Sequence, residues 1–112
     1  MLTPFILDRA AILERLGGDE EIFTMMVDMF LADAQNNCAA LQAAQAAGDG
    51  PLLQREAHTI KGLLSTFSDD DGAEIAFVLE QRAKLNQLDD AGARVALLVK
   101  RMEEVSATLS AL

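Results

Sequence analysis

The sequence predicts an all-α fold: an antiparallel up-down four-helix bundle with an additional short N-terminal helix. Alanine and leucine dominate a composition that is 51% apolar and contains no tryptophan or tyrosine. β-Branched and aromatic residues are therefore too few for a sheet. Turn-forming residues gather at four places and leave five segments of helical periodicity between them. A chain of 112 residues holds one hydrophobic core, so we expect a single domain over residues 1–112.

The first two predicted helices lie on either side of the pair Gly17-Gly18. A short helix is expected over residues 8–16, led in by the apolar residues 5–7. Asp19 can cap the second helix with its carboxylate, and this helix is expected to run to about residue 47. Its apolar residues recur at spacings of three and four and so form one stripe, made of Phe23, Met26, Phe30, Ala34, Cys38 and Leu41.

Three further helices are predicted. The third begins at Pro51, a favourable first helical residue; the fourth spans residues 70–86 with Ser68 as its cap; the fifth runs from residue 89 to the C-terminus. Amphipathic helices joined by short turns pack as an antiparallel bundle, with the short first helix over one end. The expected stripes are Leu53, Ala57, Ile60, Leu64 and Phe67; then Ile75, Val78, Leu79, Arg82 and Leu85; then Val95, Leu98, Val99, Met102, Val105, Leu109 and Leu112.

The charge of the chain argues against nucleic acid and membrane as partners. Acidic residues number 18 and basic residues 9, which gives a net charge of −9. Such a surface repels phosphate backbones and anionic lipids. No apolar run approaches the roughly 20 residues that span a bilayer, and the N-terminus lacks a basic start and a cleavage site. We therefore expect a cytoplasmic protein and, from its start at Met1, a free-standing one.

The sequence gives little support to a metal or nucleotide site. The single Cys38 cannot form an internal disulfide, and its place in an apolar stripe predicts a buried thiol in a reducing compartment. One histidine and one such cysteine are too few ligands for zinc. The run Asp69–Asp71 lacks the spacing of a calcium loop, which favours its interpretation as the charged start of a helix. The pair Gly17-Gly18 lacks the pattern of a phosphate-binding loop.

The one histidine, His58, lies in the middle of the third predicted helix, in the stretch AHTIKG. At about 100° per residue, Lys61 and Gly62 lie about 60° and 40° to either side of it on the outer face. Glycine inside a helix costs about 1 kcal/mol relative to alanine, and no core contact requires it at an outward position. The expected reason is access, because a missing β-carbon lets another molecule approach the imidazole. The same face carries Gln54, Arg55 and Ser65.

Two interpretations of His58 stay open on these residues alone. A lone surface histidine beside a lysine commonly has no function, whereas the outward glycine favours a reactive imidazole. No serine or cysteine nucleophile with a histidine base is apparent, although contacts between distant residues are invisible in a sequence.

The stretch AHTIKG resembles the signature of histidine-containing phosphotransfer (HPt) domains, in which Ala-His is followed by any residue, an aliphatic residue, Lys and Gly. The similarity extends over roughly residues 10–112. Further matching positions are Leu16 to Asp19, Asp49, Leu53 and the pair Leu79-Glu80. The sequence departs after the third helix, where Ser68-Asp69 and Gly72 replace the family's Gly-Ala and leucine, and at Leu63, where the family often has a small residue.

The resemblance implies that His58 accepts a phosphoryl group from a receiver-domain aspartate, through Nε2, and passes it to a second receiver aspartate in a multistep phosphorelay. Lys61 would steady the phosphoryl oxygens and Gly62 would admit the partner, with Gln54, Arg55 and Ser65 as secondary contacts. The expected partners are response-regulator receiver domains and a hybrid histidine kinase. Mg²⁺ would be bound by the receiver, so the chain needs no cofactor and no ATP-dependent kinase activity of its own. We expect a monomer.

A docking patch is predicted on the first half of the second helix, where Ile22, Met25 and Met29 widen the apolar face beyond the core stripe. Flexible methionines suit a surface that binds several partners. The alternative is that the first helix and residues 5–7 cover these side chains.

Two other functional classes remain. A helical adaptor or inhibitor could bind a receiver or a histidine kinase without taking phosphate. An enzyme would need a polar pocket between helices, for which the sequence supplies no constellation of residues.

Overall fold

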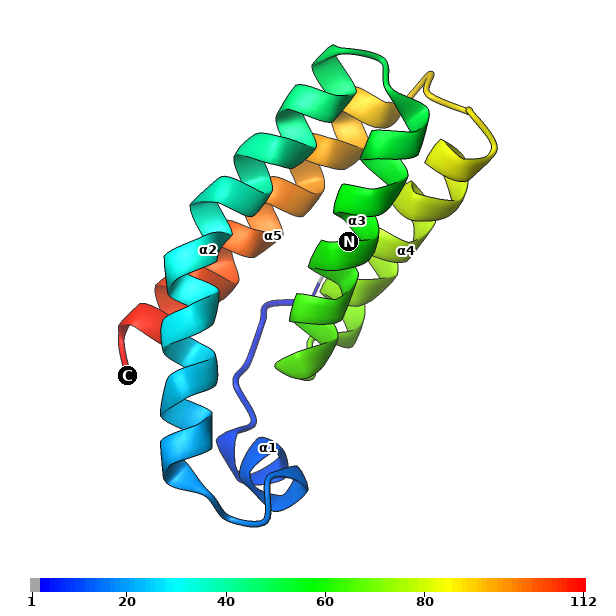
Figure 1. Cartoon of the computed structure of the whole chain (residues 1–112). Coiled ribbons are helices and arrows are strands. Elements are labelled where there is room, and N and C mark those ends of the chain that lie inside the picture. The colour runs from blue at the N-terminus through cyan, green and yellow to red at the C-terminus, as the bar shows by residue number, and fades with distance from the viewer. Residues whose placement is uncertain (1–2) are drawn as a thin grey trace.

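The computed structural model describes residues 3–112, and within them it contains five helices and no strand. The all-α prediction is thus confirmed, and each predicted helix is present with its ends displaced by at most two residues. The helices are α1 (Arg9–Arg15), α2 (Glu20–Ala46), α3 (Gly50–Thr66), α4 (Asp70–Lys84) and α5 (Ala91–Ser110) (Figure 1).

Aspartate side chains begin four of these helices. Each accepts a hydrogen bond of 3.0–3.1 Å from the backbone N–H three residues further on, and the four are Asp8, Asp19, Asp49 and Asp69. Caps of this kind each contribute about 1 kcal/mol. The prediction that Ser68 caps the fourth helix is wrong. Ser68 has φ +60° and terminates α3 in a left-handed turn, in which Asp69 N donates to Leu64 O, and Asp69 then caps α4.

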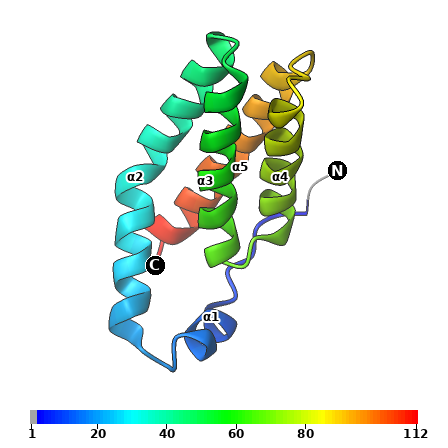
Figure 2. The ribbon, with the colours of Figure 1, turned by 45° about the vertical axis from the view of Figure 1, so that its right-hand side comes forward.

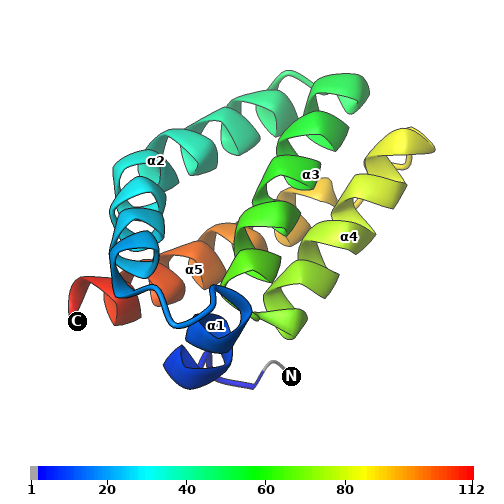
Figure 3. The same cartoon turned by 60° about the horizontal axis from the view of Figure 1, so that its bottom comes forward.

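The four long helices form a closed ring of antiparallel neighbours. α2 packs against α3 and α5, and α4 packs against the same two helices (Figures 1 and 2). α2 is the longest, so its N-terminal part projects beyond the end of α3. α1 packs against α2 and lies across that end of the bundle (Figure 3). The predicted arrangement, with a short helix over one end, is confirmed.

The core is built from apolar side chains of all five helices. The rings of Phe30 and Phe67 meet edge to face at 5.4 Å between centroids, which adds about 1 kcal/mol to their burial. Most residues of the predicted stripes of α2, α3 and α5 are buried in this core. Cys38 is only half-buried, and Leu112 is exposed.

The predicted inner face of α4 is right in part. Leu79 is buried and Ile75 packs against the core, as expected, whereas Leu85 is 64% exposed. The other buried apolar positions are the small residues Gly72, Ala76 and Ala83, which the prediction did not include. α3 and α4 make the most extensive helix contact in the ring, and small side chains allow that close approach. A stripe drawn through large apolar residues therefore misses the small residues on which this helix packs.

A group of charges, here called the arginine cluster, joins the start of α4 to α5 and consists of the buried Asp69 and Arg101 and the partly exposed Glu104. Arg101 donates from Nε and Nη2 to the two carboxylate oxygens of Asp69, at 2.8 and 2.7 Å. Its Nη1 donates to Glu104 Oε1 and to the backbone oxygen of Thr3, and Phe5 N donates to Glu104 Oε2. The cluster thereby fixes the segment before α1 alongside the bundle (Figure 2).

Candidate functional site

His58 stands on the outer face of α3, as predicted. Its side chain is 66% exposed, and its Nδ1 lies 2.8 Å from Oε2 of Glu80 on α4. An ionised carboxylate can only accept, so this contact requires the proton of a neutral ring to be on Nδ1. The other nitrogen, Nε2, then carries a free lone pair on the side of the ring away from Glu80.

Glu80 is the residue that the sequence analysis did not assign to the site. It is 8% exposed, and burial alone raises the pKa of a carboxyl group. Contacts with Lys61 and His58 outweigh the burial, so the pKa of Glu80 lies below its ordinary value and the group is ionised at neutral pH. The available signal was the pair Leu79-Glu80, whose second member is 22 residues after His58 in sequence and beside it in space.

Lys61 completes what we call the imidazole cluster: His58, Lys61 and Glu80. Its Nζ forms an ion pair with Glu80 Oε1 at 2.8 Å, and its side chain is 27% exposed. An ammonium group has three donors, so this contact with one carboxylate oxygen leaves others available. Lys61 lies on the predicted face, but a partner within the chain already engages its charge.

Gly62 lies on the same exposed face, and a β-carbon built on it would meet nothing within 4 Å. The described part of the chain therefore contains no contact that requires glycine at this position. The predicted outward placement is confirmed, and the cost of glycine inside a helix has no compensation within the fold.

The predicted secondary contacts are divided between two places. A hollow of about 380 Å³ lies beside His58, and its walls include Gln54, Arg55 and Glu80. The Arg55 side chain is 74% exposed, with a loose ion pair of 3.8 Å to Glu56. Ser65 is also exposed on α3, but it does not line this hollow.

The predicted docking patch is open. Ile22, Met25 and Met29 are 42%, 59% and 60% exposed, so the alternative that α1 and residues 5–7 cover them is wrong. Phe5 instead packs beside Arg101, with the guanidinium carbon 5.9 Å from the ring centroid. All three patch residues belong to the N-terminal part of α2.

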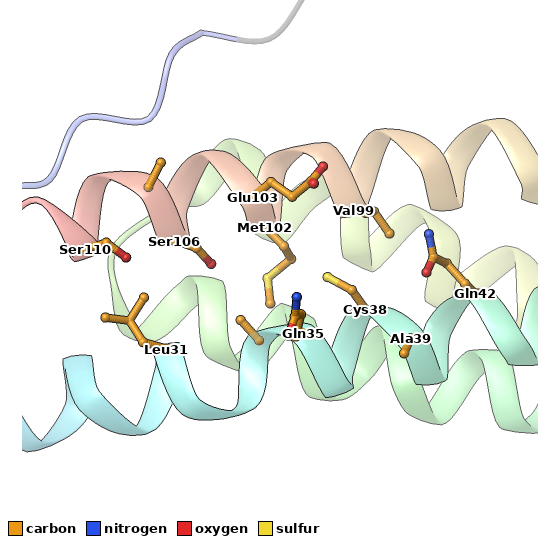
Figure 4. A pocket seen from close by; sticks show the side chains of 12 residues that line it. Leu31, Gln35, Cys38, Ala39, Gln42, Val99, Met102, Glu103, Ser106 and Ser110 are labelled. Carbon is orange, nitrogen blue, oxygen red and sulfur yellow. The ribbon is translucent and has the colours of Figure 1, made fainter.

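A groove of about 720 Å³ lies between α2 and α5, away from the imidazole cluster on α3 and α4. Figure 4 shows Cys38 and Met102 facing each other across it, with Gln35 and Gln42 along the α2 side. The expectation of a buried Cys38 was too strong, because the groove leaves the thiol half-buried; that burial still raises the pKa of the thiol.

Within residues 3–112, no group of three or more histidine, cysteine, aspartate or glutamate side chains is placed to hold a metal ion. No helix in the same range has both the length and the hydropathy needed to cross a bilayer.

Comparisons with a family model and with a solved structure both identify similarity to histidine-containing phosphotransfer domains. A family model described as Hpt domain matches residues 25–108. The crystal structure of histidine-containing phosphotransfer protein B (HptB) from Pseudomonas aeruginosa PAO1 is similar, with a TM-score of 0.83 and 25% identity over 93% of this chain and 90% of that one. No curated protein sequence matches. The matched range contains α3 and α4, the two helices that form the imidazole cluster.

Proposed function

Because the chain belongs to the Hpt domain family, we propose that His58 is the residue on which it carries a phosphoryl group. Histidine phosphotransfer within a phosphorelay is the function of this domain, which is a transfer module and not a kinase. The chain contains no other histidine, so a phosphohistidine intermediate can form only here. The observation that carries the proposal is the contact of His58 Nδ1 with the buried carboxylate of Glu80.

That contact prepares Nε2 as the nucleophile. With the proton held on Nδ1, Nε2 attacks the phosphorus of an aspartyl phosphate in line. The bond from phosphorus to the aspartate oxygen breaks, the N–P bond forms, and the electron pair of the broken bond returns to the aspartate carboxylate. The ring becomes a phosphorylated imidazolium that keeps its Nδ1 proton. The adjacent Glu80 carboxylate balances the positive charge that the ring gains.

Lys61 supplies charge on the phosphoryl side. An ammonium group has three donors, so Lys61 can contact Glu80 with one and a phosphoryl oxygen with another. Transfer of this kind depends mainly on positioning and charge neutralisation. The chain therefore needs only a nucleophile and a few charges, and the Mg²⁺ and the acidic pocket are those of the receiver.

The partner class is the receiver domain, together with a kinase that carries one. We assign docking to the exposed surface around His58 and to the patch formed by Ile22, Met25 and Met29. Gly62 lets the receiver approach the ring, and Gln54, Arg55 and Ser65 form polar contacts around it. We further propose that residues 1–112 act as a single domain, as a monomer and in the cytoplasm.

Phosphotransfer profiling tests the proposal. Each receiver domain of the host is phosphorylated, mixed with the wild-type chain or with His58→Gln in the presence of Mg²⁺, and assayed for transferred label. We expect rapid, acid-labile labelling of the wild type and none of His58→Gln. A folded wild type that takes label from no receiver, yet still binds one, would support an adaptor and overturn the proposal.

A further inference from the structure

Phe77 lies on α4, three residues before Glu80, and its ring is 42% exposed. The Lys61 Nζ lies 5.2 Å from the centroid of this ring, within the range in which a cation is attracted to an aromatic face. The ammonium therefore has two neighbours on α4: a carboxylate oxygen at 2.8 Å and a π-system. The phosphotransfer mechanism above makes no use of the ring.

We propose that Phe77 is a positioning residue of the phosphotransfer site, which acts by holding the Lys61 ammonium beside His58. The inference rests on the proposed function, in which the Lys61 ammonium contacts the phosphoryl oxygens. Lysine has a long flexible stem, and fixing it in one place costs conformational entropy. The ion pair with Glu80 contacts the ammonium on one side only, and rotation about the bonds of the lysine stem leaves its other sides free to move. The ring restricts the ammonium on a second side.

The consequence is a cation that is already in place when the phosphoryl group arrives. Without the ring, the Lys61 side chain is free to move into solvent. The entropy that it loses when it binds the phosphoryl oxygens then offsets part of the free energy of that attraction. Loss of the ring should therefore slow phosphoryl transfer itself. At a partly exposed site the effect should be about two- to fivefold.

A half-exposed phenylalanine beside Lys61 has an alternative role, which is direct contact with the receiver. Phosphoramidate separates the two roles, because this small donor transfers its phosphoryl group to an imidazole nitrogen, with release of ammonia, without a protein partner. A contribution from docking is absent in that reaction. A contribution through Lys61 remains.

The test replaces Phe77 by a series of increasingly fluorinated phenylalanines, which keep the shape of the ring and weaken its attraction for a cation. The rate of His58 phosphorylation by phosphoramidate should fall stepwise, by about two- to fivefold at full fluorination. Phe77→Tyr should keep the wild-type rate and Phe77→Leu should match the most fluorinated ring. The helical circular dichroism of every variant should equal that of the wild type.

The same series in a Lys61→Met background is the matched control, since methionine keeps an unbranched apolar stem and lacks the charge. Fluorination should then leave the rate unchanged. A rate that ignores fluorination in the wild-type background, or that responds equally in both backgrounds, would overturn the role of Phe77. Failure of the proposed function has another signature: no receiver would transfer to His58, while the phosphoramidate series would still respond.

Discussion

Two buried carboxylates, one at the cap of α4 and one within it, are paired with cations that differ in exposure. Asp69, 3% exposed, meets the Arg101 guanidinium, whose side chain is itself 2% exposed. Glu80, 8% exposed, meets His58 and Lys61, whose side chains are 66% and 27% exposed. The Asp69–Arg101 pair is therefore shielded from solvent on both sides, whereas the imidazole cluster joins a buried carboxylate to cationic and imidazole groups that solvent can reach. The exposure of the partners, and not that of the carboxylate, distinguishes the two.

The glycines near the two clusters show the same contrast. A β-carbon on Gly72 would lie 2.0 Å from Asp69 Oδ2 and 3.0 Å from Leu64 Cδ1, so the fold needs glycine there. A β-carbon on Gly62 would meet nothing. One glycine makes room for a carboxylate of its own chain, and the space beside the other is unoccupied by the described residues.

Breaking the arginine cluster should have the largest effect. Asp69→Ala leaves Nε and Nη2 of the buried Arg101 without their acceptors and removes the cap of α4, so the free energy of unfolding should fall by about 3–5 kcal/mol. Urea denaturation measures this change. The neighbouring exposed Asp70→Ala, which loses only a favourable charge in the first turn, should cost less than about 1 kcal/mol. Similar losses in the two variants would contradict the structural role of Asp69.

Adding a methyl group to each glycine should change stability in opposite directions. Gly72→Ala should lower the free energy of unfolding by about 1–3 kcal/mol, because the Asp69 carboxylate is held and cannot move aside. Gly62→Ala should raise it by up to about 1 kcal/mol, since alanine is the better helix former. Gly62→Ala should also slow transfer from a receiver by roughly tenfold, because misplaced reacting groups react slowly. Thermal unfolding and the transfer assay measure the two effects. A stabilised Gly62→Ala variant with a normal transfer rate would contradict the proposal that Gly62 gives the receiver access to His58.

Replacing the Glu80 carboxylate of the imidazole cluster by a neutral group should slow phosphoryl transfer without unfolding the chain. Glu80→Gln replaces charge-assisted contacts by weaker neutral ones and no longer balances the phosphorylated imidazolium. We expect the transfer rate to fall by about five- to tenfold. Glu74→Gln changes an exposed glutamate of the same helix and serves as the control. Equal rates in wild type and Glu80→Gln would show that the carboxylate does not contribute to phosphoryl transfer.

The lowered pKa of Glu80 gives a pH dependence of known sign. A carboxyl group with a lowered pKa in the folded state stabilises the fold above its unfolded pKa, and this contribution disappears as pH falls through the folded pKa. The stability difference between wild type and Glu80→Gln should therefore be constant at neutral pH and shrink below about pH 4.3. Urea denaturation at a series of pH values measures it. A difference that grows on acidification would reverse the assigned sign.

The smallest effect is expected outside both clusters. Met29→Ala should weaken receiver binding by about fivefold, from the loss of part of a methionine's apolar contact, with little change in stability. Leu85→Ala removes a side chain of similar exposure at the opposite end of the bundle and should leave binding unchanged. Titration calorimetry with the receiver compares the two. Loss of stability in Met29→Ala with unchanged receiver binding would contradict the docking role of this patch.

The helices and the face of His58 could be predicted from the sequence because both depend on local spacing. The inner face of α4 could be predicted only at Leu79 and Ile75, since the rest of its close packing on α3 uses glycine and alanine, which a search for large apolar residues misses. Both buried carboxylates were missed as partners of distant cations. Arg101 is 32 residues after Asp69, and only the folded ring of helices brings the two together. Ser68 looked like a cap because hydroxyl residues favour that position, but its positive φ ends the preceding helix.

The nitrogen to which phosphate becomes attached is the most direct test of the role assigned to the His58–Glu80 contact. ¹⁵N NMR of the His58 ring, after phosphorylation by a receiver, distinguishes the two products. We expect phosphate on Nε2 and a proton retained on Nδ1 beside Glu80. Phosphate on Nδ1, or on a residue other than His58, would contradict it.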